Sequence, residues 1–550
     1  MAVTTQMKQE VAATIDSLIA PGYSKEMALG GAYEAADKFD RAMALWNPPM
    51  LSADREIIPN KPQMEARVRD MLRNDGYVQS GQVLHRDNIV GSMFMLNAKP
   101  DYKVLGLDDS WAEEFQQEVE AKFTLAAEST NCWLDASRTN TLTGLVRLAV
   151  GVYAASGEVL ATVEWLRENP RPFRTAIQMV DIDRLGTPYE YAMDGFVRGG
   201  VRLDSRGAPL GYYIRKAHPS DYDRGNEAND FKFVPTRKPW GRLQVLHIKE
   251  QFRAEQTRGV ADMVAGLKEL RITKRFRDIT LQNAVVNAMF AASIESELPT
   301  EAVFSQLGGN NIGQGITDYA SAYLGAVAQY TGGSRNMQID GVKIPHLFPG
   351  TKLSLHPAGN PGGVGQEFET SLLRYIASIL GVSYEQLSKD FTKTNYSSAR
   401  AAMTETWKFM QSRKRIVADR FASSLYQLWF EEVLNAGQLE TMKFSKAPNY
   451  YEGLNAEAYC AAEWIGAARG QIDELKETQA SVLKLKYCLS THEAELSRLG
   501  KDWRAVYSQL AREKKEREKL GIELVEDNAI NAASGEPGQG ADEPKGGGNT

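Results

Sequence analysis

The 550-residue sequence has only three cysteines, and none of them lies near another. Cys132, Cys460 and Cys488 form no CxxC pair, so we expect neither a disulfide framework nor a zinc site, and a reducing compartment fits. No stretch approaches the roughly 18 uninterrupted apolar residues of a membrane span. The first residues also lack a basic start followed by a long apolar core. We therefore expect an intracellular, soluble protein without a signal peptide or a membrane partner.

The sequence also lacks the common motifs of catalysis. There is no GxxxxGK followed by Ser or Thr, and the glycine-rich runs 308–315 and 359–366 lack the Lys that a phosphate loop needs, so flexible loops are favoured there. There is no GxSxG, and the segment that begins at His492 and Glu493 lacks the second His of a zinc site. We expect no enzyme activity, no cofactor and no resident metal.

Two charged segments leave alternatives open. Asp181 and Asp183 would share one face of a strand and could bind a metal, but a solvated strand face is the favoured interpretation. Lys268–Arg277 is the densest basic run, and we favour a solvated helix face over a contact surface for nucleic acid or an acidic neighbouring subunit. The formal net charge of −6 argues against tight wrapping of nucleic acid, although it allows DNA to slide past.

The hydrophobic pattern changes along the chain. A period of two between 174 and 250, as in AIQMVDI, GYYIRKA and LQVLHIKE, predicts strands, and residues 140–166 mix helical and apolar character. Residues 299–366 are irregular, with one helix near 316–330 and a strand pair near 338–356. Helices are expected at 35–46, 60–75, 261–296, 367–380, 397–434 and, in a highly charged stretch, 456–521. Two helices that flank an irregular insert can carry it away from an α/β body, so we expect an α+β protein.

Four blocks of sequence share a pattern with one known family. Their family-like residues are Arg69, Asp70, Arg73 and Asn74 with Asn88, Val90 and Gly91; His247, Gln256, Arg258 and Gly259; the run from Leu380 to Arg400, including Tyr396, Ser397 and Ser398; and Asp473, Lys476 and Glu477 with Gly500, Asp502 and Trp503. Over roughly 36–523 the chain resembles the lambda-type family of tailed-bacteriophage portal proteins. It departs from the pattern at Glu474, where Pro is common, and at Cys488, where Gly is common.

The resemblance implies a portal-type subunit in a ring, usually of twelve, at one capsid vertex of the virion, assembled in the host cytoplasm. The implied partners are the terminase large subunit, head–tail connector proteins, scaffold, major capsid protein and, in passing, double-stranded DNA. The implied division is a mobile N-terminal arm at 1–35, an α/β wing at 36–255, a first stem helix at 256–296, a clip at 297–366, a second stem helix at 367–388, a tunnel loop at 389–396, a long wing helix at 397–439, a helical crown at 440–522 and a disordered tail at 523–550.

The implied tunnel loop contains the residues expected to face DNA. Lys389 and Lys393 could touch phosphates transiently, and Thr394 and Asn395 offer weak polar contacts. A plain capped helix start at Asn395 or Ser397 is the alternative interpretation of the same residues. For the whole chain, a DNA-processing enzyme and a scaffold protein of head assembly are the competing hypotheses. The first would need a phosphate loop or an acidic cluster, and the second leaves the strand-rich region unexplained.

Overall fold

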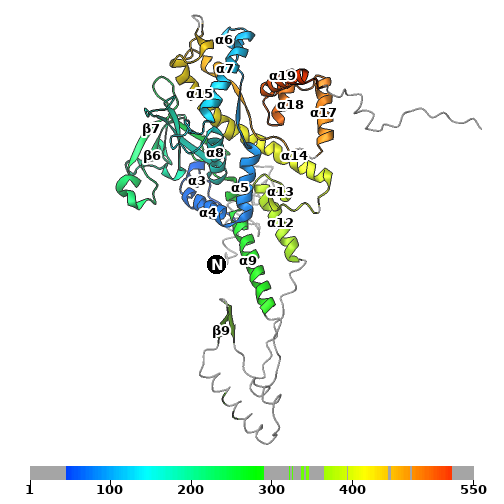
Figure 1. Ribbon diagram of the computed structural model, residues 1–550. Helices are drawn as coiled ribbons and strands as arrows, with labels where there is room; N and C mark the ends of the chain where they lie inside the picture. The colour runs from blue at the N-terminus through cyan, green and yellow to red at the C-terminus, as the bar shows by residue number, and fades with distance from the viewer. Residues whose placement is uncertain are drawn as a thin grey trace, which may run out of the picture.

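The structure is a computed structural model that describes residues 45–289, 336–339, 342–345 and 364–522, except 393, 444–446 and 471–472, together with residues 321 and 325. It has a body of helices and small sheets, two helices that project from this body, and three helices at the C-terminal end (Figure 1). This mixed class was expected. The predicted arm and tail, and most of the helices expected at 35–46 and 316–330, lie outside the described residues.

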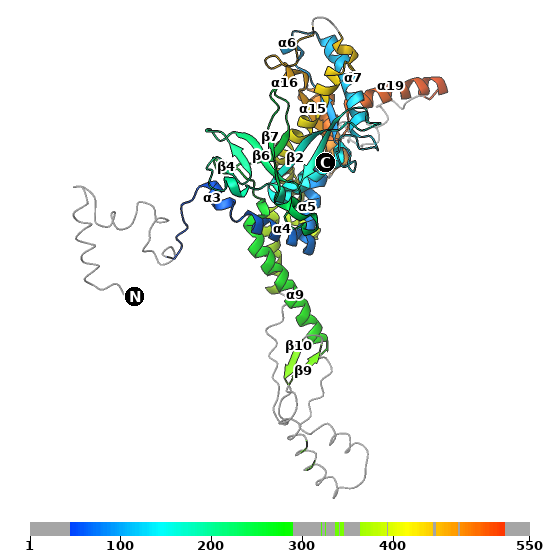
Figure 2. The ribbon, with the colours of Figure 1, turned by 90° about the vertical axis from the view of Figure 1, so that its left-hand side faces the viewer.

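Three helices on the N-terminal side form the part of the body nearest the projecting pair (Figures 1 and 2). They are α3 (Ala53–Ile57), α4 (Lys61–Asn74) and α5 (Gly76–Ile89). The helix predicted at 60–75 is therefore confirmed. Asp75 separates α4 from α5, and its carboxylate accepts hydrogen bonds from the backbone N–H groups of Tyr77 at 3.0 Å and Val78 at 3.2 Å. This cap satisfies N–H groups that a helix start leaves without partners, and so fixes the turn.

The strand-rich region forms two antiparallel sheets. The predicted strands are confirmed as β3 (Thr175–Val180), β6 (Pro209–Arg215) and β8 (Val245–Lys249). A three-stranded sheet has the order β3-β2-β8, where β2 is Glu158–Trp165, and Leu160 of β2 lies opposite Val180 and His247. A four-stranded sheet has the order β4-β5-β6-β7, with β4 at Val197–Arg198, β5 at Val201–Leu203 and β7 at Phe231–Pro235.

The core lies between the three-stranded sheet and the helices α7 (Asp109–Ala127), α8 (Leu142–Ser156) and α15 (Arg420–Asn435). The mixed segment 140–166 proves to be α8 followed by β2, with Gly157 at φ +73° between them. Trp429, Tyr426 and Phe123 are fully buried, and Phe123 meets the other two rings edge to face, with centroids 5.1–5.3 Å apart. Burial of such aromatic side chains supplies much of the stabilising apolar area of a core.

The long helix expected at 397–434 is present, but it contains a change of helix type. It consists of α14 (Tyr396–Arg413), a π-helical segment (Lys414–Asp419) and α15. Lys414 Nζ lies 2.8 Å from the carbonyl oxygen of Trp464 and 2.6 Å from the Asp419 carboxylate. The wider turn therefore brings a lysine to the neighbouring strand, which a period of 3.6 residues does not predict.

Two helices project together from the body (Figures 1 and 2). They are α9 (Leu267–Met289) and α12 (Val364–Ile379), and the rings of Phe276 and Phe368 meet edge to face at 5.4 Å. The segment Asp262–Gly266 is a 3-10 turn rather than the start of the predicted helix. The hairpin β9 (Asn336–Ile339) and β10 (Val342–Pro345) confirms the start of the predicted strand pair, and residues 346–356 lie outside the described part. None of the described helices is long and apolar enough for a membrane span.

The C-terminal region differs from the continuous helical stretch predicted at 456–521. Residues 462–465 form a strand, β11, which pairs with β1 (Met95–Ala98), so Trp464 lies opposite Leu96. Trp464 also stacks on Phe94 at 5.5 Å, and this burial outweighs the local helical pattern. The remaining described helices and 3-10 turns are α6 (Tyr102–Leu105), α13 (Tyr384–Ser388), α16 (Asn455–Tyr459), α17 (Glu474–Lys486), α18 (His492–Arg498), α19 (Trp503–Leu520), Ile182–Arg184, Tyr189–Tyr191, Tyr222–Ala228 and Glu440–Met442.

Candidate functional site

The loop between α13 and α14 contains the residues that the sequence suggested for DNA contact. Ser383 and Gln386 form a capping box at the start of α13, and Lys389 ends this helix with φ +60°. Lys389 is exposed, whereas Lys393 lies outside the described residues. The exposed Phe391 belongs to the same loop. The structure thus leaves Lys389 available to a partner, while its role stays a prediction.

The start of α14 has the predicted cap. The Asn395 side chain accepts a hydrogen bond from the Ser398 backbone N–H at 2.8 Å, so Asn395 rather than Ser397 is the N-cap. Asn395 and Ser397 are exposed, and Thr394 is half-buried. Arg400 is exposed near Met403 and Glu477, at the edge of a shallow hollow. Tyr396 begins the helix. These residues therefore form a rigid boundary for the loop.

A second set of motif residues converges inside the body on Glu158, the first residue of β2. We name Glu158, Lys61, His247, Arg258 and Gly259 the Glu158 cluster. The Glu158 carboxylate lies 2.9 Å from Lys61 Nζ and accepts hydrogen bonds of 2.8 Å from Arg258 Nε and the Gly259 backbone N–H, with His247 Nε2 also at 2.8 Å. The carboxylate is completely buried, and a buried charge is tolerated only with such partners.

Electrostatics inside this cluster are set by burial and by pairing. Burial acts to raise the pKa of the Glu158 carboxyl, but Arg258 and Lys61 outweigh it and hold that pKa well below its ordinary value. Burial lowers the pKa of His247 despite its hydrogen bond to Glu158. Glu65, 2.8 Å from Lys61 Nζ, has its pKa raised to about 7 by burial. The cluster therefore contains one firmly ionised carboxylate, and the neighbouring Glu65 carboxyl has a pKa near neutral pH.

Gln256 and Gly259 shape the backbone that supplies this cluster. The Gln256 side chain donates to the carbonyl oxygen of Arg258 at 2.8 Å and accepts from the backbone N–H of Phe252 at 3.0 Å. A Cβ atom on Gly259 would lie 2.2 Å from the carbonyl oxygen of Gly157. Only glycine allows the two backbone segments to come so close, so Gln256, Arg258 and Gly259 together connect the chain before α9 to the start of β2.

The first motif block has a different set of contacts. Arg69 donates to both carboxylate oxygens of Asp183, and its bond to Oδ1 measures 3.0 Å. Asp70 accepts a hydrogen bond from the Asn74 side chain at 2.7 Å, and Arg73 is exposed on α4. The Asn74 carbonyl oxygen accepts a hydrogen bond from Lys274 Nζ of α9 at 2.8 Å. Two of these four motif residues, Arg69 and Asn74, thus connect α4 to distant segments.

The expectation of a shared strand face at Asp181 and Asp183 is wrong. β3 ends at Val180, and Asp181 caps the 3-10 turn that follows it, because its side chain accepts the Asp183 backbone N–H at 3.0 Å. His218 approaches the Asp183 carboxylate at 3.1 Å, so these three residues are close enough to hold a cation. The Arg69 guanidinium already provides the positive charge there. Burial acts to raise the pKa of Asp183, but hydrogen bonds led by that of Arg69 lower it to about 2.

The basic run Lys268–Arg277 attaches α9 to the body, a role that sequence reasoning missed. Arg277 lies 2.6 Å from the Asp75 carboxylate and 4.9 Å from the centre of the Tyr77 ring. Lys268, Arg271 and Arg275 of the same run are exposed or half-buried, which agrees with the favoured solvated face. The turn at Asp75 therefore fixes both α5 and the base of α9.

The second projecting helix is attached through a histidine. His85 of α5 lies 2.8 Å from the carbonyl oxygen of Leu380, directly after α12, and its ring meets Phe409 of α14 edge to face at 5.9 Å. Burial lowers the pKa of His85. The His85 side chain therefore contacts both the end of α12 and the helix α14.

Glu158 and Lys61 were also missed, although they form the centre of the buried cluster. One signal was present: Glu158 is an acidic residue inside the apolar run LVRLAVGVYAASGEVLATVEW. A charge in such a run is expected to have a buried partner. The identity of that partner depended on contacts across the fold, because Lys61 and Arg258 are far from Glu158 in the sequence.

Most of the described motif residues thus position helices and loops of the body. The family model for the lambda family of phage portal proteins matches residues 39–414. Portal protein B of Escherichia phage lambda and the portal protein of Escherichia phage N15 are each 34% identical over 510 residues, which cover 92% of this chain and 94% of the relative. The chain therefore belongs to the lambda family of phage portal proteins.

Two more distant similarities are also found. A probable portal protein of Halomonas phage phiHAP-1 is 21% identical over 478 residues, with 86% of this chain and 83% of the relative covered. A solved structure titled as the neck of an empty GTA particle has a TM-score of 0.35 and 13% identity, and it covers 79% of this chain and 93% of that chain.

Proposed function

We propose that this chain is the subunit of a closed ring of twelve at one capsid vertex, which forms the channel for DNA packaging and ejection. The observation that carries the proposal is the 34% identity with portal protein B of phage lambda over nearly the whole of both chains. A channel needs subunits arranged in a closed circle. Head-to-tail contacts form such a ring when the rotation from one subunit to the next divides evenly into a full turn. The protein would act as a structural conduit in the virion, without catalysis, after assembly in the host cytoplasm.

We assign the body to the wing, the projecting pair α9 and α12 to the stem, and 297–366 to the clip. Two features support adjusted boundaries. Gln256 and Arg258 pack inside the body, so the first stem helix would begin at Leu267 rather than at 256. The pairing of β11 with β1 ties 462–465 to the wing, so the crown would comprise α17, α18 and α19.

In this arrangement the loop 389–395 would line the channel. The exposed Lys389 would touch DNA phosphates in passing, and Lys393 is proposed to do the same. Such contacts are sequence-blind and salt-sensitive, as sliding requires. The formal net charge of −6 agrees with weak rather than tight contact.

The clip, 297–366, would dock the terminase large subunit and the head–tail connector proteins, since segments carried on rigid supports commonly carry binding. The outer wing would meet scaffold and major capsid protein. Deletion of 308–335 should leave rings visible by negative-stain microscopy, yet abolish binding to the terminase large subunit and packaging in a complementation assay. Normal terminase binding by this deletion variant would refute the clip assignment. A competing scaffold role would instead give elongated oligomers without a central hole.

A further inference from the structure

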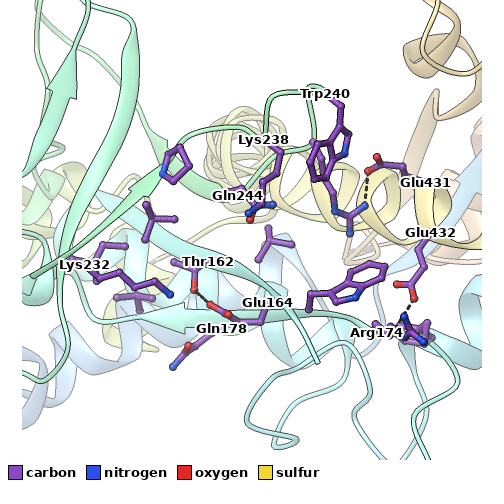
Figure 3. A pocket seen from close by; sticks show the side chains of 18 of the residues that line it. Thr162, Glu164, Arg174, Gln178, Lys232, Lys238, Trp240, Gln244, Glu431 and Glu432 are labelled. Carbon is purple, nitrogen blue, oxygen red and sulfur yellow. Dashed lines mark hydrogen bonds and ion pairs between the residues drawn. The ribbon is translucent and has the colours of Figure 1, made fainter. Parts of the chain in front are cut away.

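A broad groove with an excess of positive charge lies between the two sheets and the end of α15. Its volume is about 1350 Å³, and its lining includes eight lysines and arginines but only three glutamates. In Figure 3, Lys238 and Trp240 lie on one side of the groove and Thr162, Glu164 and Gln178 on the other. The portal role proposed above gives this groove no task.

The glutamates of the groove are already engaged. Glu431 pairs with Arg242, and Glu432 accepts hydrogen bonds from the backbone N–H groups of Arg174 at 2.7 Å and Thr175 at 2.8 Å (Figure 3). Glu164 accepts a hydrogen bond from Thr162 at 2.8 Å. Among the described residues, Glu431 is thus the one glutamate of the three that forms an ion pair with a cation of the groove.

Several cations in the groove lack an acidic partner. Within the part of the chain that the structure describes, Lys232, Lys238 and Arg174 form no ion pair with a carboxylate. Arg171 Nη1 and Arg215 Nε are buried and have no hydrogen-bond acceptor among the described residues. Burial lowers the pKa of Arg171, of Arg184 and of Arg215. An anionic occupant would relieve this uncompensated charge.

The sequence contains an acidic segment of matching charge. Residues 523–550, which follow α19, contain six Asp and Glu residues and a single lysine, Lys545. Fully extended, a segment of this length spans on the order of 90 Å. Figure 1 places α19 and the groove strand β7 on opposite sides of the body, so a segment leaving α19 of a neighbouring copy is the better source.

We propose that the groove binds the acidic segment 523–550 of a neighbouring copy of this chain. This intersubunit contact rests on the ring proposed above. Lys232 and Lys238 attract carboxylates at the open side, and the exposed Trp240 covers the bound backbone. A peptide fits the lining better than nucleic acid does. Arg174 and Arg242 lie over the Trp165 ring and so occupy the face on which a base would stack.

The first test uses a fluorescein-labelled synthetic peptide of residues 523–550. The receptor is the full chain with its six tail carboxylates replaced by Asn or Gln, which leaves the groove unoccupied by its own tail. Fluorescence anisotropy should show saturable binding at low salt that weakens as salt is added. Lys232→Glu with Lys238→Glu should weaken binding at least about tenfold. The matched control, Lys103→Glu with Lys501→Glu, makes the same charge change at exposed lysines elsewhere and should leave binding unchanged.

Two results of this titration would overturn the proposal. One is no binding, or equal loss of binding in the groove variant and the control variant. The other is that a duplex DNA probe binds the groove while the peptide does not, which would assign the surface to nucleic acid. Thermal unfolding and native mass of each variant show whether it is folded and whether it forms rings. Failure of the tail contact is thereby distinguished from failure of the ring.

A cross-linking test addresses the source of the segment. One full chain carries Gln178→Cys in the groove, and another carries Ser534→Cys in the acidic segment, both with the exposed Cys488 replaced by Ser. Mixed before ring assembly and oxidised mildly, the two chains should form a disulfide-linked dimer. Lys103→Cys in place of Gln178→Cys should form far less of this dimer. Equal cross-linking at both positions, or cross-linking only within one chain carrying both changes, would contradict the proposal.

Discussion

Two sets of residues from the family-like blocks lie in different surroundings. The body encloses Gln256, Arg258 and Gly259, whereas its surface carries Lys389 and Asn395. The first set completes the Glu158 cluster through hydrogen bonds of 2.8 Å. The second set forms a loop whose described bonds are mostly local, such as the cap from Asn395 to Ser398. A family pattern therefore marks two different kinds of residue. Some hold the body together, and others lie on its surface.

The largest effect is expected at the centre of the buried set. Glu158→Gln would leave Arg258 buried without its anionic partner and Lys61 with Glu65 alone, which costs about 3–5 kcal/mol of unfolding free energy. Thermal and denaturant unfolding should show this loss. Glu164→Gln, on the same strand but half-buried, should cost about 0.5 kcal/mol or less. Equal stability of the two variants would show that the Glu158 cluster does not hold the body together.

The close backbone approach at Gly259 gives the next largest effect. Gly259→Ala would place Cβ 2.2 Å from the carbonyl oxygen of Gly157, and relieving that overlap should cost about 1–3 kcal/mol. Gly76→Ala is a suitable control, because nothing lies within 4 Å of a Cβ at that position. The two variants should differ clearly in melting temperature. An unchanged melting temperature for Gly259→Ala would mean that β2 and the chain before α9 can separate freely.

Glu65 makes the stability of the body depend on pH. Burial raises its pKa from 4.5 to about 7 in the folded protein. A carboxyl with a raised pKa contributes stability that is fully present below the unfolded pKa and is lost as the pH rises through the folded pKa. Relative to Glu65→Gln, the parent should lose on the order of 2 kcal/mol of unfolding free energy between about pH 5 and pH 8. If the unfolding free energies of the parent and of Glu65→Gln changed with pH in the same way, the titration could not be assigned to Glu65.

The smallest effect on stability is expected in the loop. Lys389→Ala with Lys393→Ala should change the unfolding free energy by less than about 0.5 kcal/mol, because Lys389 is exposed and surface substitutions usually have small effects. Ring assembly should be unchanged, while packaging efficiency or retention of packaged DNA should fall. A structure of the ring with both lysines buried in a subunit interface would sink the channel role. So would a double variant that packages and retains DNA as well as the parent.

The parts that sequence predicted well depend on local signals. Alternation identified β3, β6 and β8, and the cap chemistry identified the start of α14. The parts it missed depend on distant contacts. β11 is a strand because it pairs with β1, far away in the sequence. The acceptor for Arg258 could not be found without knowing that Glu158 begins the adjacent strand. Whether Lys389 faces a channel depends on the neighbouring copies of the ring.

Native mass spectrometry of the purified 550-residue protein shows whether this chain closes into a ring. We expect a single dominant species with twelve times the mass of the 61.0 kDa chain, together with a central hole in negative-stain images. A protein that stays monomeric at high concentration, both with and without added salt, would contradict it.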